Sequence, residues 1–155
     1  MFSALIKRLF FLLALLWPIG ASAQSVAVYG NWCGPNYPSN PALAGPPVDA
    51  LDAACMRHDI CTAERGRFNC GCDLSFMTEL RTTRWQNPAI QSQARSIYDA
   101  IAVIPCTDPV GTAQKQSLFI QDAMTDVFNG SAAPVDIMDR WRWLLNGVRV
   151  KKTKP

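Results

Sequence analysis

The chain contains a single histidine, His58, and no G-x-S-x-G motif among its 155 residues. The absence of that nucleophile elbow argues against an ordinary serine lipase. No stretch alternates polar and apolar residues with a period of two, and no internal repeat occurs. Neither a β-rich fold nor a repeat architecture is therefore expected, and the sequence predicts a mainly α-helical protein.

The sequence also shows neither a large excess of charge of one sign nor a long apolar run. The formal net charge is +3, and residues 1–23 carry two of the 15 basic residues and none of the 12 acidic ones. Residues 24–155 are thus almost neutral, which gives no electrostatic reason to expect nucleic acid as a partner. The apolar run at 9–17 is too short, and wrongly flanked, for a membrane span.

Residues 1–23 have the features of a signal peptide. They contain a basic n-region at 7–8, an apolar h-region at 9–17 and an A-x-A cleavage site at 21–23. The mature chain is predicted to begin at Gln24, with an uncleaved anchor as the alternative. The remaining residues, 24–155, suffice for one domain with a modest core. A secreted or periplasmic protein is expected.

The chain has six cysteines, and all of them follow the predicted leader. They lie at positions 33, 55, 61, 70, 72 and 106. An even number of cysteines in a small exported domain indicates disulfides. A zinc site is the weaker interpretation, because Cys70-x-Cys72 is tighter than the usual C-x₂-C knuckle and His58 is not spaced to complete one. Spacing alone does not select a connectivity.

The lone histidine lies in a segment that predicts a helix from about residue 48 to 65. Two prolines precede this segment, and no glycine or proline interrupts it. One helical face carries, at i, i+4, i+7 and i+11, the residues Leu51, Cys55, His58 and Thr62. Asp52 and Asp59 form the adjacent stripe, so an acid projects beside the histidine.

A lone histidine on a half-apolar helix face is usually a hydrogen-bonded structural residue. His58 differs because Asp59 follows it directly and because Cys55 and Cys61 flank it. A glycine-containing loop with its own cysteine, Cys33, precedes the helix. This combination favours a catalytic histidine over a structural one.

Three segments resemble, in order, motifs of the secreted phospholipase A2 family. They are YGNWCGPN at 29–36, PPVDALDAACMRHDIC at 46–61 and CGCD at 70–73. The family carries a YGxxCGxG calcium loop, a PxDxLDxCCxxHDxC helix and a CxCD start of the next long helix. The resemblance covers residues 29–73, less than a third of the chain. The C-terminal half matches no motif of the family.

The resemblance implies a disulfide pattern. Cys33 would pair with Cys55, and Cys61 would pair with Cys72. Cys70 and Cys106 would then be left for each other. The first bond would tie the loop to the helix that carries His58, and the second would draw the next helix against it.

The resemblance also implies an activity, the calcium-dependent hydrolysis of the sn-2 ester of glycerophospholipids. His58 would take a proton from water, and Asp73 would hold the other imidazole nitrogen. Calcium would be bound by the carboxylate of Asp59 and by three loop carbonyls. Those carbonyls belong to Trp32, Gly34 and Asn36. A non-catalytic membrane- or receptor-binding protein on the same scaffold is the alternative, and a purely structural disulfide module is a third.

Four positions depart from the family pattern. Asn36 and Tyr37 replace a usual pair of glycines, and Ala54 replaces a usual cysteine. Thr62 stands where the family has a tyrosine that supports the catalytic hydrogen-bond network. Tyr98 is expected in the core, and the alternative is that its hydroxyl supplies this support.

Beyond the first helix, apolar spacing predicts four more helices, at about 72–85, 88–103, 112–128 and 134–146. The short connection at 66–71 makes the first two helices antiparallel. In the helix at 112–128 the inner stripe is predicted to be Leu118, Phe119, Ala123 and Val127. The spacing predicts a mainly α, disulfide-crosslinked helical domain, and the resemblance implies that it contains two antiparallel catalytic helices and a calcium-binding loop.

A phospholipid membrane or micelle surface is the expected partner, and the protein is expected to be a monomer. Residues 146–155 form a basic tail that follows two tryptophans at 141 and 143. This tail could bind anionic lipid, with the tryptophans at the headgroup level. The alternative is a solvated tail with no such role.

Overall fold

In the computed structural model, the residues described are 25–133, 135–136 and 138. The predicted signal peptide at 1–23 and the basic tail at 146–155 lie outside the described residues. The predicted helix at 134–146 also lies outside them, apart from three positions.

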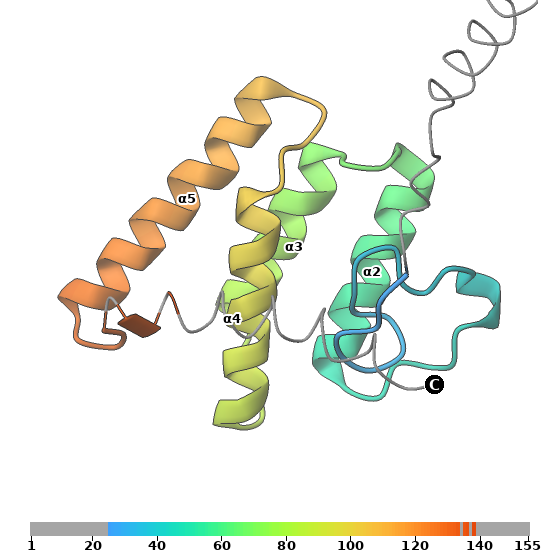
Figure 1. The fold of residues 1–155 in the computed structure, drawn as a ribbon, viewed down its shortest axis with the longest axis horizontal. Helices are drawn as coiled ribbons and strands as arrows, with labels where there is room; N and C mark the ends of the chain where they lie inside the picture. The colour runs from blue at the N-terminus through green and yellow to red at the C-terminus, as the bar shows by residue number, and fades with distance from the viewer. Residues whose placement is uncertain (1–24, 134, 137, 139–155) are drawn as a thin grey trace, which may run out of the picture.

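The described part of the chain is helical (Figure 1). Its elements are a short 3₁₀ helix η1 (Pro41–Leu43) and the α-helices α2 (Ala50–Arg65), α3 (Cys70–Thr82), α4 (Pro88–Val103) and α5 (Pro109–Phe128). Within the described residues the only β-type pairing is an isolated bridge between Tyr29 and Cys33. The prediction of a mainly α-helical domain is confirmed.

Each long helix begins behind a side chain that caps its free backbone N–H groups. The capping residues are Asp49, Asn69, Asn87 and Asp108. These caps explain why three predicted starts were wrong, since a capped helix begins directly after its cap. Thus α2 begins at residue 50 rather than 48, α3 at 70 rather than 72, and α5 at 109 rather than 112.

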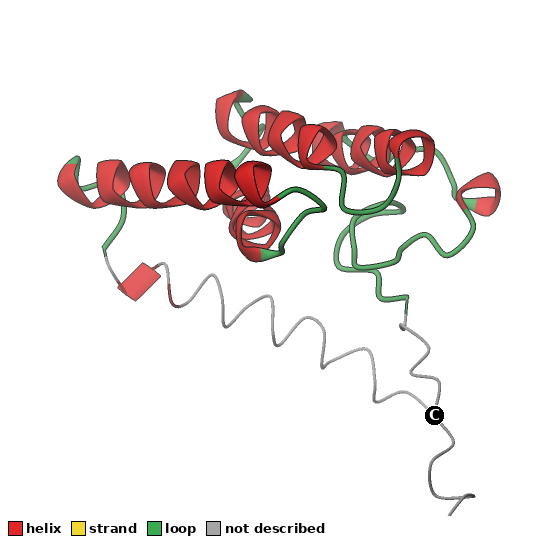
Figure 2. Ribbon diagram, turned by 90° about the horizontal axis from the view of Figure 1, so that it is seen from above, coloured by secondary structure: helices red, strands yellow, loops and turns green. Residues whose placement is uncertain are grey.

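Helix α3 lies between α2 and α4, and α5 packs on α3 and α4 (Figure 1). The long loop before α2 lies at the end of the molecule away from α5, as Figure 2 also shows. The core is made by Trp32, Cys33, Leu51, Ala54, Cys55, Phe76, Met77, Leu80, Ala94, Ile97, Tyr98 and Ala102. None of the described helices is both long enough and apolar enough to cross a membrane.

Helix α5 is less buried than its sequence predicts. Of the expected inner stripe, Phe119 packs against the core, but Leu118 is 38% exposed. The only fully buried residues of α5 are Gly111 and Lys115. The predicted stripe is therefore wrong at Leu118, because polar contacts rather than apolar ones set the rotation of this helix.

Three disulfides crosslink the domain, and no described cysteine is free. They join Cys33 to Cys55, Cys61 to Cys72 and Cys70 to Cys106. The pairing implied by the resemblance is confirmed. The bonds connect the N-terminal loop to α2, α2 to α3, and the start of α3 to the α4–α5 connection.

Candidate active site

His58 and Asp73 lie together between α2 and α3. The Nε2 atom of His58 is 2.9 Å from Oδ1 of Asp73, and the side chains are 14% and 6% exposed. The Cys61–Cys72 disulfide sits beside both residues, since Cys61 is three positions after His58 and Cys72 precedes Asp73. With Nε2–H donating to the carboxylate, Nδ1 carries a lone pair and can accept a proton.

The imidazole of His58 is also held by an aromatic contact. Its ring stacks on Phe76, with ring centroids 4.6 Å apart and planes inclined by 17°. Phe76 lies three residues after Asp73, so both project from one face of α3. Asp73 holds the edge of the imidazole by a hydrogen bond, and Phe76 holds its plane by stacking. Helical spacing does not show which ring a buried side chain will contact, so this stacking could not be predicted from the sequence.

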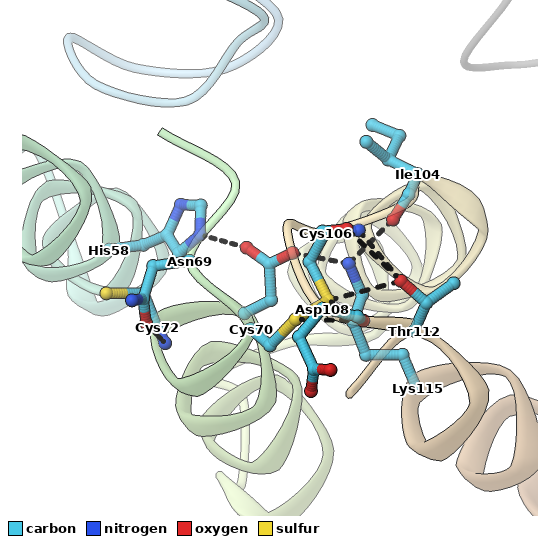
Figure 3. A network of polar contacts seen from close by, with 10 residues as sticks. His58, Asn69, Cys70, Cys72, Ile104, Cys106, Asp108, Thr112 and Lys115 are labelled. Carbon is cyan, nitrogen blue, oxygen red and sulfur yellow. Dashed lines mark hydrogen bonds and ion pairs between the residues drawn. A yellow bond between two sulfur atoms is a disulfide. The ribbon is translucent and has the colours of Figure 1, made fainter. Parts of the chain in front are cut away.

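Asp73 has a second partner that the sequence analysis missed. The ammonium group of Lys115, on α5, donates to Oδ2 of Asp73 and, at 2.7 Å, to the carbonyl oxygen of Ile104. His58 contacts one oxygen of the Asp73 carboxylate and Lys115 the other, and Figure 3 shows these two residues approaching from different helices. Burial alone would raise the pKa of Asp73, but the hydrogen bonds from His58 and Lys115 and the charge of Lys115 lower it. Asp73 is therefore ionised at neutral pH.

Neither Thr62 nor Tyr98 supports the carboxylate. The hydroxyl of Thr62 donates to the backbone oxygen of Asp59 at 3.0 Å. Tyr98 is buried, as predicted, and its hydroxyl donates to Asp122 on α5. The alternative role considered for Tyr98 is therefore wrong, and Lys115 supplies the hydrogen bond that neither hydroxyl makes.

Asp59 faces the other side of the imidazole. Its Oδ1 is 3.9 Å from Nδ1 of His58, and its Oδ2 is buried without a hydrogen-bond partner among the described residues. Burial raises the pKa of Asp59 to about 7, although His58 acts in the opposite direction. A buried carboxylate oxygen without a donor is rare in proteins. A hard cation satisfies such an oxygen, so this feature fits the predicted calcium ligand.

The N-terminal loop is attached to α2 through another carboxylate. The buried Asp52 accepts hydrogen bonds from the backbone N–H groups of Asn31, Trp32 and Val48 at 2.8–3.0 Å. Gly30 has a φ of +55°, and a Cβ atom there would lie 2.3 Å from Cγ of Asp52. Only glycine therefore fits beside this carboxylate. The sequence placed Asp52 only on the stripe beside the His58 face, since its role depends on the loop that folds over it.

Of the predicted loop ligands, Trp32 is attached to α2 through its backbone N–H, which donates to Asp52, and its neighbour Cys33 is bonded to Cys55. The side chain of Trp32 is buried, and its indole donates to Gly45. The carbonyl of Gly34 accepts a hydrogen bond from Tyr37, and the side chain of Asn36 accepts one from Arg67. In the described part of the chain, no three His, Cys, Asp or Glu side chains group as metal ligands. A calcium site here would therefore depend on backbone carbonyls in addition to Asp59.

Comparisons with known proteins add no relative. No family model matches the chain, and searches of curated proteins and solved structures return no significant match.

Proposed function

We propose that the protein is a calcium-dependent phospholipase A2. The observation that supports this most is the arrangement around His58. One ring nitrogen is paired with the ionised Asp73, and the other lies 3.9 Å from the half-buried Asp59 carboxylate, which has an oxygen without a donor among the described residues. The motifs at 29–36, 46–61 and 70–73, which resemble those of secreted phospholipases A2, supply the substrate class.

The chain's own residues account for the proton transfers of ester hydrolysis. Nδ1 of His58 takes a proton from water as the water oxygen bonds to the carbonyl carbon at the sn-2 position. Asp73 stabilises the imidazolium and keeps the proton on Nε2. When the ester bond breaks, the imidazolium returns the proton to the leaving glycerol oxygen. The products are a lysophospholipid and a fatty acid, and no covalent enzyme intermediate is needed.

Calcium would be held by Asp59 and by the carbonyls of Trp32, Gly34 and Asn36. When bound, it supplies positive charge that stabilises the oxyanion and the substrate phosphate. The Cys33–Cys55 bond supports this assignment, because it anchors the loop one turn before Asp59. The expected substrate surface is a phospholipid membrane or micelle.

The cellular setting is part of the same proposal. The leader-like residues 1–23 and the three disulfides favour an exported protein, secreted or periplasmic, that acts as a monomer. A non-catalytic membrane- or receptor-binding protein on this scaffold is the alternative class.

Fatty-acid release from phospholipid micelles tests the proposal, with calcium and with a chelator. His58→Gln is expected to lower turnover by about 100- to 10,000-fold, because it removes the general base. Glu64→Gln, at an exposed position of the same helix, is the matched control and keeps full activity. Equal turnover by the His58→Gln variant would refute the mechanism. Vesicle binding without release by the wild type would instead support the alternative class.

A further inference from the structure

Lys115 is the largest fully buried side chain of the described residues, at 0% exposure. A buried ammonium group is costly unless it is paired and hydrogen-bonded. Here it bonds to the Asp73 carboxylate and to the carbonyl of Ile104, which lies just after α4. Both acceptors are themselves fixed, one by α3 and the other by the C-terminal end of α4. The lysine thus connects three helices at the point where the candidate catalytic carboxylate lies.

We propose that Lys115 is a positioning residue for the hydrolysis, a role that rests on the proposed function. It holds Asp73 so that one carboxylate oxygen always faces His58. The two oxygens are divided between the partners, with Oδ1 on His58 and Oδ2 on Lys115. Rotation of the carboxylate would break both contacts at once. The hydrogen bond to Asp73 orients the imidazole. By holding Asp73, Lys115 therefore affects His58 without contacting it.

The fold places Lys115 through a glycine and a disulfide. Gly111 precedes Lys115 by four residues, so both lie on one face of α5, and both are buried. A Cβ atom at Gly111 would lie 2.5 Å from both Cβ and Sγ of Cys70. Cys70 in turn lies three residues before Asp73 on α3. The absence of a side chain at residue 111 therefore lets α5 approach the start of α3 closely enough for Lys115 to reach Asp73.

The charge of Lys115 adds an effect that a hydroxyl group in the same place would not have. It lowers the pKa of Asp73 against the opposing effect of burial. With neutral His58, the group of three side chains has no net charge, and it becomes singly positive only when His58 takes the proton. Without Lys115, Asp73 would be a buried carboxylate with one oxygen lacking a donor, free to rotate away from the imidazole.

The kinetic test is Lys115→Met, which keeps an unbranched side chain as far as the ε position and removes the ammonium group. We expect kcat to fall about 10- to 100-fold, by analogy with the loss seen when the hydrogen-bond partner of a metal ligand is removed. KM and the affinity for calcium should stay unchanged, because Lys115 touches neither substrate nor loop. Gln116→Met, at the next and exposed position of α5, is the matched control. A kcat within about twofold of wild type, or a change confined to KM, would overturn the inference.

A spectroscopic test does not depend on activity. His58 is the only histidine, and the other lysines after the predicted leader are Lys151, Lys152 and Lys154, so tag-free protein gives readily assigned imidazole and ammonium signals. In the wild type, nitrogen NMR should show a slowly exchanging Lys115 ammonium group and an Nε2-protonated imidazole. Lys115→Met should shift and broaden the imidazole signals. A Lys115 ammonium group that exchanges as fast as the other lysines would overturn the inference, even if the variant failed to fold.

The two proposals fail in different ways. Absence of lipid hydrolysis by the wild type, together with the expected NMR signals, would overturn the phospholipase proposal and leave the orienting role of Lys115 standing. Hydrolysis by the wild type with unchanged kcat in Lys115→Met would do the reverse.

Discussion

Helices α3 and α5 contribute side chains to the same small cluster, yet different forces hold them in the fold. Helix α3 buries Cys72, Asp73, Phe76, Met77 and Leu80 against its neighbours. Helix α5 is longer and completely buries only Gly111 and Lys115, while Ile120, Met124 and Phe128 remain exposed. Helix α3 is held by apolar packing and two disulfides, whereas α5 is held largely by contacts between charged side chains.

The ionic contacts of α5 continue along its length. Asp122 pairs with Arg81 at 2.6 Å and accepts the hydroxyl of Tyr98, and Asp126 pairs with Arg95. Apolar contacts are not screened by salt, whereas partly exposed ion pairs weaken as the salt concentration rises. The comparison therefore indicates that the attachment of α5 through its partly exposed ion pairs responds to salt more than the attachment of α3 does.

The substitution with the largest expected effect on activity and stability is at Asp73, where α3 meets α5. Asp73→Asn should nearly abolish hydrolysis and should also lower the free energy of unfolding by about 3–5 kcal/mol, because it leaves the Lys115 ammonium group buried without its counter-charge. Urea unfolding measures the second effect. The double variant Asp73→Asn/Lys115→Met should recover much of the stability but none of the activity. If the single variant is as stable as the wild type, Lys115 is not paired as described.

The two disulfides of α3 can be removed separately, which weakens one of its connections to the rest of the domain at a time. Replacement of Cys61 and Cys72 by serine, or of Cys70 and Cys106, should each cost about 2–5 kcal/mol of stability. Loss of the Cys61–Cys72 bond should reduce activity by more than the unfolded fraction explains, since this bond seats Asp73 beside His58. Activity per folded molecule, from assays at several urea concentrations, separates the two effects. A decrease proportional to unfolding would show that the bond has only a structural role.

Apolar and ionic attachment can be compared directly with one variant of each kind. Leu80→Ala in α3 should destabilise the protein by about 2–5 kcal/mol, with the same value at low and high salt. Asp126→Asn in α5 should cost only about 1 kcal/mol, and the difference from the wild type should disappear in 1 M salt. Thermal unfolding at two salt concentrations tests both. A salt-independent loss for Asp126→Asn would contradict the ionic attachment of α5.

The smallest effect concerns the hydroxyl of Tyr98 at the α4–α5 contact. Burial and the hydrogen bond to Asp122 raise the pKa of Tyr98, while Arg81 and Arg95 act in the opposite direction. Because the pKa is raised in the folded protein, the stabilisation is complete below the unfolded value of about 10 and is lost as the pH rises above it. Tyr98→Phe should therefore show a weaker decline in stability above this pH. Identical alkaline unfolding curves would rule out this contribution.

Part of the arrangement around His58 could be predicted from short sequence patterns, and its contact with Asp73 was implied by the family resemblance. The spacing that puts Cys55 and His58 on one helix face, and the motif that places Asp73 after Cys72, are both short-range. The starts of α3 and α5 were predicted less well, because they are set by the capping residues Asn69 and Asp108. The predicted burial of α5 was wrong at Leu118, because the spacing of apolar residues does not reveal that a lysine faces inward.

The sequence by itself determined the helical class, and it supplied as predictions the export signal, the candidate base His58, its partner Asp73 and the calcium carboxylate Asp59. The tertiary structure alone showed the disulfide geometry, the unpaired oxygen of Asp59, the stacking of Phe76 on His58 and the partner of Asp73. Lys115 lies 42 residues after Asp73. The physical reason is that a buried charge is tolerated only where distant segments bring it a counter-charge, and no local pattern records which segments will meet.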